Sequence, residues 1–314
     1  MVDSKQQWKA WLYLAPAIIL LLVFTVWPIF NTIRMSLLEN YSGLQAVGGA
    51  KFNFGFGNFV SVWKYKGFKQ CMTNTILLCV LTVPISTFLA LLIAVCLNAI
   101  KPLRKLLQTI FFLPYVTNSI AIGMVFAAMF NVIGSAFGTS AEIITSAGII
   151  NNVLQFFGLP IVNWIGPGST YVANMTVMVI YIVWNALPFK ILILLGGLQS
   201  INRQYYDAAK VDGTSRHRVF WRITVPLLSP MLAYVIITGF IGGFKEYTSI
   251  VGIFGAGMGP ADAKGRLNTM VGFIYDALST NKQGRASAAA LILFVIILAV
   301  TLVNLYVSKK RVHY

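Results

Sequence analysis

Charged side chains are scarce in this sequence, and acidic ones are the scarcest. Of 314 residues only 10% are charged, with 8 Asp and Glu against 24 Lys and Arg. Soluble domains carry roughly 25% charged residues, so the low charge and the 58% hydrophobic content exclude a soluble globular protein. Apolar stretches of helical length between polar ones instead predict an all-α integral membrane protein.

Residues that do chemistry are equally few. The only histidines, His217 and His313, are too far apart in sequence to indicate a catalytic triad or a metal site. The three cysteines, Cys71, Cys79 and Cys96, lack metal-ligand spacing, and packing is their better interpretation. No G-x-x-x-x-G-K-[ST] loop is present to cradle a nucleotide phosphate. We therefore expect no enzymatic activity, no metal site and no cofactor in this chain.

The net charge of +16 raises the question of nucleic acid binding. The Lys and Arg residues lie between apolar runs rather than on one basic face, which disfavours a nucleic acid partner. They are better suited to setting the topology and meeting anionic lipid head groups. We expect membrane lipid and no nucleic acid among the partners.

Six apolar runs are long enough to cross a bilayer, which takes about 20 residues. The uncharged part of the first run is longer than the roughly 7–15 residues of a signal-peptide core, so we expect an uncleaved span. The expected spans are Trp11–Ile33, Asn74–Leu97, Leu107–Phe130, Tyr171–Leu195, Leu227–Phe244 and Ala286–Val307.

Basic residues give the expected orientation. They are dense in the short segments at the N-terminus, around residues 101–105, in the loop 199–226 and at the C-terminus, and are spread thinly over the longer loops of the other side. Short basic loops remain cytoplasmic. We therefore expect cytoplasmic tails at 1–10 and 308–314, a first transmembrane helix at 11–33, an extracytoplasmic loop at 34–73, and a core at 74–307 that holds five spans.

The loop 199–226 is a basic segment between two apolar runs. Asp207, Ala208 and Ala209 have small side chains that allow close helix approach, Gly213 can end a short helix, and Pro226 suits the first turn of the next one. A helix, a turn and a second helix outside the bilayer are predicted. An ordinary solvated loop is the simpler alternative.

The spacing of this loop resembles a known motif. Asp207-Ala208-Ala209, three residues, Gly213, nine residues, Ile223 and then Pro226 follow the pattern E-A-A-x3-G-x9-I-x-L-P, with Asp for Glu and Val for Leu. That pattern is the "EAA" loop of permease subunits of binding-protein-dependent ABC importers. FFLPYVTNSIAIGMVFAAMFN, from Phe111, and LPFKILILLGGLQSINRQYYDAAKVDG, from Leu187, are similar to carbohydrate-type permeases, in particular the F-type member of a permease pair.

The resemblance implies a fold and a set of partners. The fold would be that of type I ABC importer permeases, with six transmembrane helices in the bacterial cytoplasmic membrane. The partners would be a G-type permease as heterodimer, two copies of a cytoplasmic ATPase that binds ATP and Mg²⁺, and an extracellular solute-binding protein. The loop 199–226 would dock on the ATPase and drive alternating access. The substrate would be a carbohydrate, and the glycines expected along its path favour an oligosaccharide.

The resemblance also implies where the substrate passes. The sugar-facing positions on the fourth and fifth spans fall at Ile182, Asn185, Ala186, Phe189, Gly239, Gly242 and Gly243, and several of them are apolar where a maltose-type site is polar. Amide, aromatic and carboxylate groups nearby can bind and stack on a sugar. The predicted path residues are Tyr181, Trp184, Asn185, Phe189, Gly239, Gly242, Gly243 and Glu246. Packing of the aromatic residues and helix contact at the glycines are equally plausible roles.

Two other functions stay open. A permease of the same class for a polyamine, a glycerol phosphate ester or a peptide would carry the same coupling loop. A secondary carrier would also have broken helices, but it needs acidic groups within its spans for ion coupling. Glu246 is the only carboxylate close to a predicted span.

Overall fold

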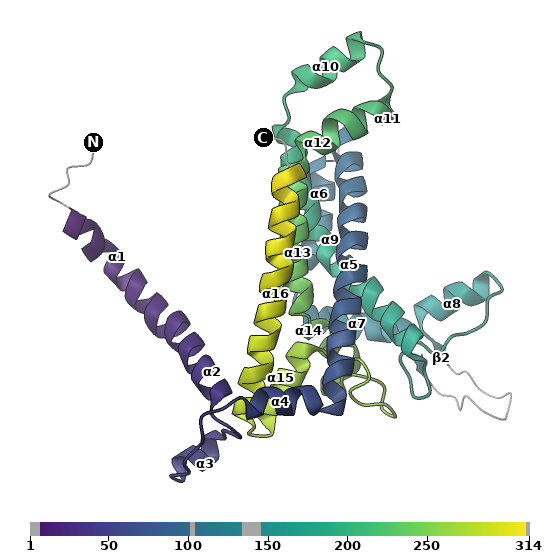
Figure 1. The fold of residues 1–314 in the computed structure, drawn as a ribbon. Helices are drawn as coiled ribbons and strands as arrows, with labels where there is room; N and C mark the ends of the chain where they lie inside the picture. The colour runs from purple at the N-terminus through teal and green to yellow at the C-terminus, as the bar shows by residue number, and fades with distance from the viewer. Residues whose placement is uncertain (1–6, 101–103, 134–145, 312–314) are drawn as a thin grey trace. The chain divides into compact units, whose positions relative to one another are not determined.

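The computed structural model describes residues 7–100, 104–133 and 146–311 (Figure 1). The chain divides into two compact units, one made of the described residues up to Lys69 together with Phe273–Phe294, the other of Gln70–Gly272 and the residues from Val295 on. The helices are α1 Gln7–Leu21, α2 Trp27–Leu37, α3 Gly43–Val47, α4 Gly57–Lys64, α5 Lys66–Ala99, α6 Arg104–Val116, α7 Ser119–Phe130, α8 Ile149–Phe156, α9 Tyr171–Ser200, α10 Arg203–Val211, α11 Arg216–Val219, α12 Val225–Leu227, α13 Ser229–Phe244, α14 Thr248–Phe254, α15 Met270–Ser279 and α16 Gln283–Arg311.

Four helical stretches are long and apolar enough to cross a membrane: Trp8–Leu37, Lys66–Ala99, Tyr171–Ser200 and Gln283–Lys309. Two further candidates are bent pairs, Leu106–Val116 with Ser119–Phe130 at 99° and Arg216–Leu227 with Ser229–Phe244 at 66°. With each pair counted as one span, the described residues hold up to six spans, the predicted number. The predicted span Leu107–Phe130 corresponds to the first bent pair, which is broken at residues 117–118.

Local chemistry explains the break between α6 and α7. Pro114 lies within α6, where a proline removes a backbone hydrogen bond and weakens the helix. The side chain of Asn118 then accepts a hydrogen bond from the Ile120 amide at 2.9 Å and so caps the start of α7. After α7, Val132–Ile133 (β1) pairs antiparallel with Ser146–Ala147 (β2), a two-residue ladder in a chain expected to be all-α.

Prolines also explain two widened turns. The π-helical segments Leu22–Val26 and Phe220–Thr224 each end two residues before a proline, Pro28 and Pro226. A proline ring clashes with the carbonyl four residues earlier, and a π turn relieves that clash. The bent pair that contains Pro226 continues into α13.

In the first unit, the predicted loop 34–73 is largely helical. Asn58, at the start of α4, donates hydrogen bonds to the carbonyl oxygens of Ser36 (3.0 Å) and Leu38 (2.6 Å). The Tyr41 carbonyl accepts a hydrogen bond from the Gly284 amide at 3.0 Å, which joins this segment to the first turn of α16. Helix α5 begins at Lys66, eight residues before the predicted start of the second span.

The second unit has two apolar clusters along α9. One contains Met178, Tyr181 and Ile250, and the other contains Ala90, Leu194 and Leu228. In Figure 1, α10 and α11 lie beyond the ends of α5 and α13, and α14 lies near the opposite ends of these helices. The long helices α5, α9 and α13 therefore have short helices at both of their ends, and they enclose a cavity between them.

Close glycine contact holds α7 against α14. A Cβ atom added to Gly123 would lie 2.7 Å from the Cα of Gly252, so the two backbones meet with no side chain between them. Small residues are what allow membrane helices to approach this closely.

Candidate functional site

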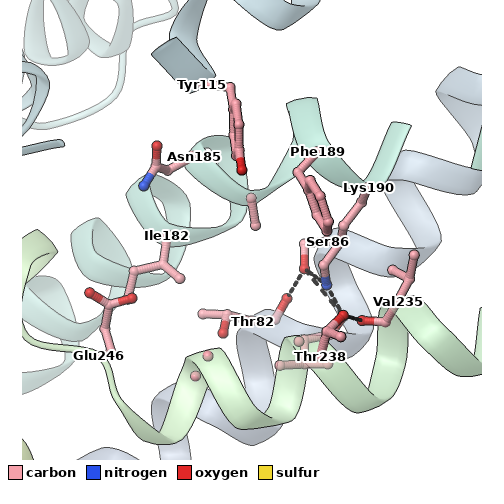
Figure 2. A pocket seen from close by; sticks show the side chains of 15 residues that line it. Thr82, Ser86, Tyr115, Ile182, Asn185, Phe189, Lys190, Val235, Thr238 and Glu246 are labelled. Atoms are coloured by element: carbon pink, nitrogen blue, oxygen red, sulfur yellow. Dashed lines mark hydrogen bonds between the residues drawn. The ribbon is translucent and has the colours of Figure 1, made fainter. Parts of the chain in front are cut away.

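A cavity of about 290 Å³ opens within the second unit. Its walls come from α5, α6, α9, α13 and the turn after α13 (Figure 2). Four of the lining side chains carry a hydroxyl group, and they lie next to apolar side chains. The lining residues are Thr82, Val83, Ser86, Tyr115, Ile182, Asn185, Ala186, Phe189, Lys190, Val235, Thr238, Gly239, Gly242, Gly243 and Glu246.

The three glycines of α13 have different surroundings. At Gly242 an added Cβ would meet nothing within 4 Å, so this glycine borders open space. At Gly243 it would lie 2.9 Å from the sulfur of Cys79 on α5, and at Gly239 it would lie 3.1 Å from Val83 and 3.3 Å from Nζ of Lys190. Gly242 therefore makes room in the cavity, whereas Gly243 makes room for helix α5.

Lys190 brings a buried cation to the wall. Its side chain is 5% exposed, and Nζ donates hydrogen bonds to Ser86 Oγ at 2.7 Å, to Thr87 Oγ1 at 2.9 Å and to the Val83 carbonyl at 3.3 Å. All three acceptors are on α5 and all are uncharged. Lys190 thus links α9 to α5, and its charge has no carboxylate within ion-pair distance among the described residues.

Two aromatic rings form another part of the wall. The rings of Tyr115 on α6 and Phe189 on α9 stack with centroids 5.8 Å apart and planes 18° apart. Asn185 also lines the cavity, and its amide has no hydrogen-bond partner among the described residues (Figure 2). An aromatic face beside a free amide suits a ligand with apolar faces and hydroxyl groups.

Glu246 closes the end of the cavity away from Lys190 (Figure 2). It lies past the end of α13, outside the candidate spans, and one carboxylate oxygen accepts hydrogen bonds from the amides of Tyr247 and Ser249, both at 3.2 Å. Burial raises the pKa of the Glu246 carboxyl group, and these hydrogen bonds oppose the rise.

The predicted coupling loop forms a helix, a turn and a second helix. The Asn202 side chain caps α10 by accepting from the Gln204 amide at 3.0 Å. Gly213 ends the turn with φ +63°, a conformation that other residues rarely adopt. Ala209 is buried against the rest of the unit, whereas Asp207 and Ala208 are exposed. Ile223 and Pro226 are half-buried in the second helical part.

Asp207 has an ion pair of its own within α10. Its Oδ1 lies 3.0 Å from Nζ of Lys210, and both side chains are largely exposed. Behind the loop, a hollow of about 690 Å³ is lined by residues that include Tyr206, Gly213 and Phe220. The exposed surface of α10 includes Tyr205 and Val211, the latter 89% exposed. This surface suits contact with another protein.

Residues 75–313 match the family described as the inner membrane component of binding-protein-dependent transport systems. The chain belongs to this family. The match covers the cavity, the coupling loop, most of the second candidate span and all of the later ones. The permease is thus the membrane-spanning component of a binding-protein-dependent importer, as the resemblance implied, and a secondary carrier is excluded.

Relatives of the permease match it over nearly their whole length. It is 31% identical over 312 residues to the lactose transport system permease protein LacF of Rhizobium radiobacter, covering 96% of this chain and 95% of that protein. It is 29% identical over 307 residues to the sn-glycerol-3-phosphate transport system permease protein UgpA of Agrobacterium fabrum, covering 97% and 96%.

A solved structure shows the same fold. One chain of a bacterial alginate ABC transporter, solved in complex with an alginate pentasaccharide-bound periplasmic protein, matches the permease with a TM-score of 0.75 and 23% identity. The match covers 98% of this chain and 96% of that one. The permease therefore has the type I ABC importer permease fold expected from its sequence.

The structure brings six of the eight predicted path residues to the cavity: Asn185, Phe189, Gly239, Gly242, Gly243 and Glu246. It places the other two in packing. Tyr181 is fully buried and its hydroxyl donates to the Ser119 carbonyl, and the ring of Trp184 packs on Phe126 with centroids 5.0 Å apart. Both side chains contact α7, through Phe126, and neither is among the residues that line the cavity.

Several lining residues of the permease were not predicted. Lys190 is the most informative of them, because an ionisable residue inside a span is a candidate functional residue by default. The sequence signal was present in the run LPFKILIL, where this lysine is the only charge. Ser86, Thr82 and Thr238 lie in apolar runs too, but isolated hydroxyl residues are common in membrane helices and gave no signal.

Proposed function

We propose that the permease conducts an oligosaccharide through the cavity between α5, α9 and α13. The observation that carries this proposal is the wall itself, where the stacked Tyr115 and Phe189 rings lie beside the unpartnered amide of Asn185. Aromatic faces pack on the apolar faces of sugar rings, and an amide can donate to and accept from hydroxyl groups. The open space at Gly242 widens the passage for a solute larger than one sugar ring.

The same proposal includes the partners. A G-type permease would complete the membrane pathway as a heterodimer, and two copies of a cytoplasmic ATPase would bind ATP and Mg²⁺. Helix α10, with Asp207 and Ala208 exposed, would dock on the ATPase and transmit its closure to the spans. An extracellular solute-binding protein would deliver the sugar. Both termini and the loop 199–226 would be cytoplasmic.

The name of one relative supports the sugar, and that of another supports the main alternative. LacF is named for lactose transport and UgpA for transport of sn-glycerol 3-phosphate, at 31% and 29% identity. The alginate transporter shares the fold. The choice between a sugar and a smaller phosphate ester therefore rests on the cavity rather than on overall similarity.

The test is ATP-dependent uptake by the importer complex, isolated from its own host through a tag on this chain and placed in liposomes with its binding protein. Labelled oligosaccharide pools of two to six residues, spermidine, sn-glycerol 3-phosphate and a tripeptide are offered separately. We expect uptake from the oligosaccharide pools only. Uptake of one of the other solutes, with none from the oligosaccharide pools, would refute the sugar assignment.

A variant links the uptake to the cavity. Asn185→Leu removes the amide and is expected to lower oligosaccharide uptake about tenfold to a hundredfold, since an unmatched buried hydrogen-bonding group costs about 1–3 kcal/mol. Thr176→Val, on the same helix but outside the cavity, is the matched control and should transport normally. Equal rates for both variants would move the path away from α9.

A further inference from the structure

We propose that the cavity selects a saccharide that carries an anionic group, and that Lys190 recognises this group. The inference rests on the proposed oligosaccharide function and names the substrate class more closely. Its basis is a charge inside the membrane-spanning part with no opposite charge beside it. Such a charge is costly unless a ligand or a water-filled cavity compensates it.

The described neighbours of Lys190 do not neutralise it. Its three acceptors are two hydroxyl groups and one backbone carbonyl, all on α5. Ser86 and Thr87 are themselves buried, with 1% and 6% exposure, so little water reaches the ammonium group from that side. Hydrogen bonds to these uncharged groups hold the ammonium group in place but do not neutralise its charge. An anionic group in the cavity could neutralise it.

The side chain of Lys190 forms part of the cavity wall beside a glycine of α13. Lys190 lines the cavity, and on α13 it meets a glycine instead of a side chain: the position of a missing Cβ at Gly239 lies 3.3 Å from Nζ. Of the three hydrogen bonds of Lys190, the one to the Val83 carbonyl is the longest at 3.3 Å. A ligand oxygen in the cavity can take this hydrogen and keep the two bonds to Ser86 and Thr87.

The other end of the cavity holds an acidic residue. Glu246 lies there, and Figure 2 shows it well separated from Lys190. Its carboxylate is held by the amides of Tyr247 and Ser249. A negative group of the ligand is therefore expected to lie at Lys190, with hydroxyl groups of the sugar toward Glu246. The stacked rings of Tyr115 and Phe189 would lie beside the sugar ring.

Two chemistries supply such a group, the carboxylate of a uronic acid and a phosphate ester. The probes are oligosaccharide pools of two to six residues from polygalacturonate and polymannuronate. Each pool is also offered after its carboxyl groups are reduced to hydroxymethyl groups, and again after chemical phosphorylation of the reduced pool. The three forms share chain length and linkage, so they differ in the charged group alone.

The experiment measures ATP-dependent uptake of each form by the tagged complex with its binding protein in liposomes. We expect a charged form to be taken up about tenfold to a hundredfold faster than the reduced form, the range that one charge-assisted hydrogen bond provides. Preference for the uronate or for the phosphorylated form identifies the source of the charge.

Three variants test Lys190 itself. Lys190→Gln keeps hydrogen bonding to Ser86 and Thr87 but removes the charge, and it should reduce the preference to about onefold to threefold. Lys190→Arg keeps the charge and should retain a preference. Gly239→Ala places a methyl group against Nζ while leaving the lysine in place, and it should reduce the preference as well. Lys64→Gln makes the same chemical change at an exposed position in the first unit and should change nothing.

The outcomes separate this inference from the proposed function. Faster uptake of the reduced pools, or an unchanged preference in Lys190→Gln, overturns the anion inference while oligosaccharide transport stands. Uptake of no pool in any form overturns the proposed function, and the anion inference with it. If Lys190→Gln yields too little complex, loss of preference in Gly239→Ala supports the inference and an intact preference in that variant overturns it.

Discussion

Gly243 on α13 touches Cys79 on α5, because a Cβ atom at Gly243 would lie 2.9 Å from the Cys79 sulfur. The Cys79 thiol also lies 3.6 Å from the Phe240 carbonyl, one turn earlier on α13. The contact shows that this glycine allows two helices to meet. Its neighbour Gly242 has nothing within 4 Å of the same position. Adjacent glycines of α13 therefore have different roles, helix contact at Gly243 and open space at Gly242. The sequence alone does not distinguish these roles.

Substitution distinguishes these roles. Gly242→Leu should place a side chain in the cavity and lower uptake at least about tenfold, while the thermal stability of the complex stays near that of the wild type. Gly243→Leu should destabilise the complex, because overpacking a tight helix contact costs about 1–3 kcal/mol. Gly196→Leu, at a glycine of α9 that is outside the cavity and also borders open space, is the control. Equal loss of stability in the first two variants would contradict the assignment.

Gly213 is predicted to be required for its backbone conformation alone. It has φ +63° and nothing within 4 Å of a missing Cβ, so a new side chain meets strain but no clash. Gly213→Val should cost about 1–2 kcal/mol at the turn and lower both uptake and binding-protein-stimulated ATPase activity. Gly213→Asn is the matched test, because Asn tolerates this conformation better. Equal defects in the two variants would point to a steric role instead.

Asp207 should act on a partner rather than on the fold. Its pair with Lys210 is exposed, and such pairs contribute about 0–1 kcal/mol. Asp207→Arg is nevertheless expected to lower stimulated ATPase activity at least about tenfold, since charge reversal at an interface costs roughly 2–5 kcal/mol. Lys210→Gln breaks the same pair and keeps Asp207, so it should have little effect. A strong defect in Lys210→Gln would show that the ion pair itself matters.

The topology predicts that Ser215 and Ser279 lie on opposite sides of the membrane. Both side chains are exposed, which suits labelling with an impermeant thiol reagent after each is changed to Cys. Cys71 and Cys79 are buried, but Cys96 is exposed, so the background is Cys96→Ser. In intact cells we expect labelling at position 279 and none at 215. Labelling of position 215 from outside would reverse the proposed orientation.

The spans were predictable from sequence because their signal is local. Twenty apolar residues in a row identify a membrane helix without knowledge of its neighbours. The 99° bend after α6 could not be located from the sequence in the same way. A proline lies in α6 (Pro114), but prolines also lie in α5 (Pro84) and α9 (Pro188), and those two helices continue past them. Whether a proline ends a helix depends on the packing around it.

The same limit applies to the candidate site. Asn185 and Gly242 were found through family resemblance and both lie on the cavity wall, yet Tyr181 and Trp184 leave the same helix toward Phe126. The sequence does not show which aromatic side chains of α9 line the cavity and which pack against a neighbouring helix. Lys190 was missed because its partners Ser86 and Thr87 precede it by about a hundred residues, at separations of 104 and 103.

The contact between Gly123 and Gly252 gives the short helices a mechanical role. With no side chain between the two backbones, α7 and α14 have no compressible layer that could absorb a displacement. Glu246 precedes α14 directly and is hydrogen-bonded to its first turn through Ser249. A tilt of α7 about the bend at Asn118 would therefore move the acidic end of the cavity with it. We therefore expect α7 and α14, neither of which lines the cavity, to determine the position of Glu246 together.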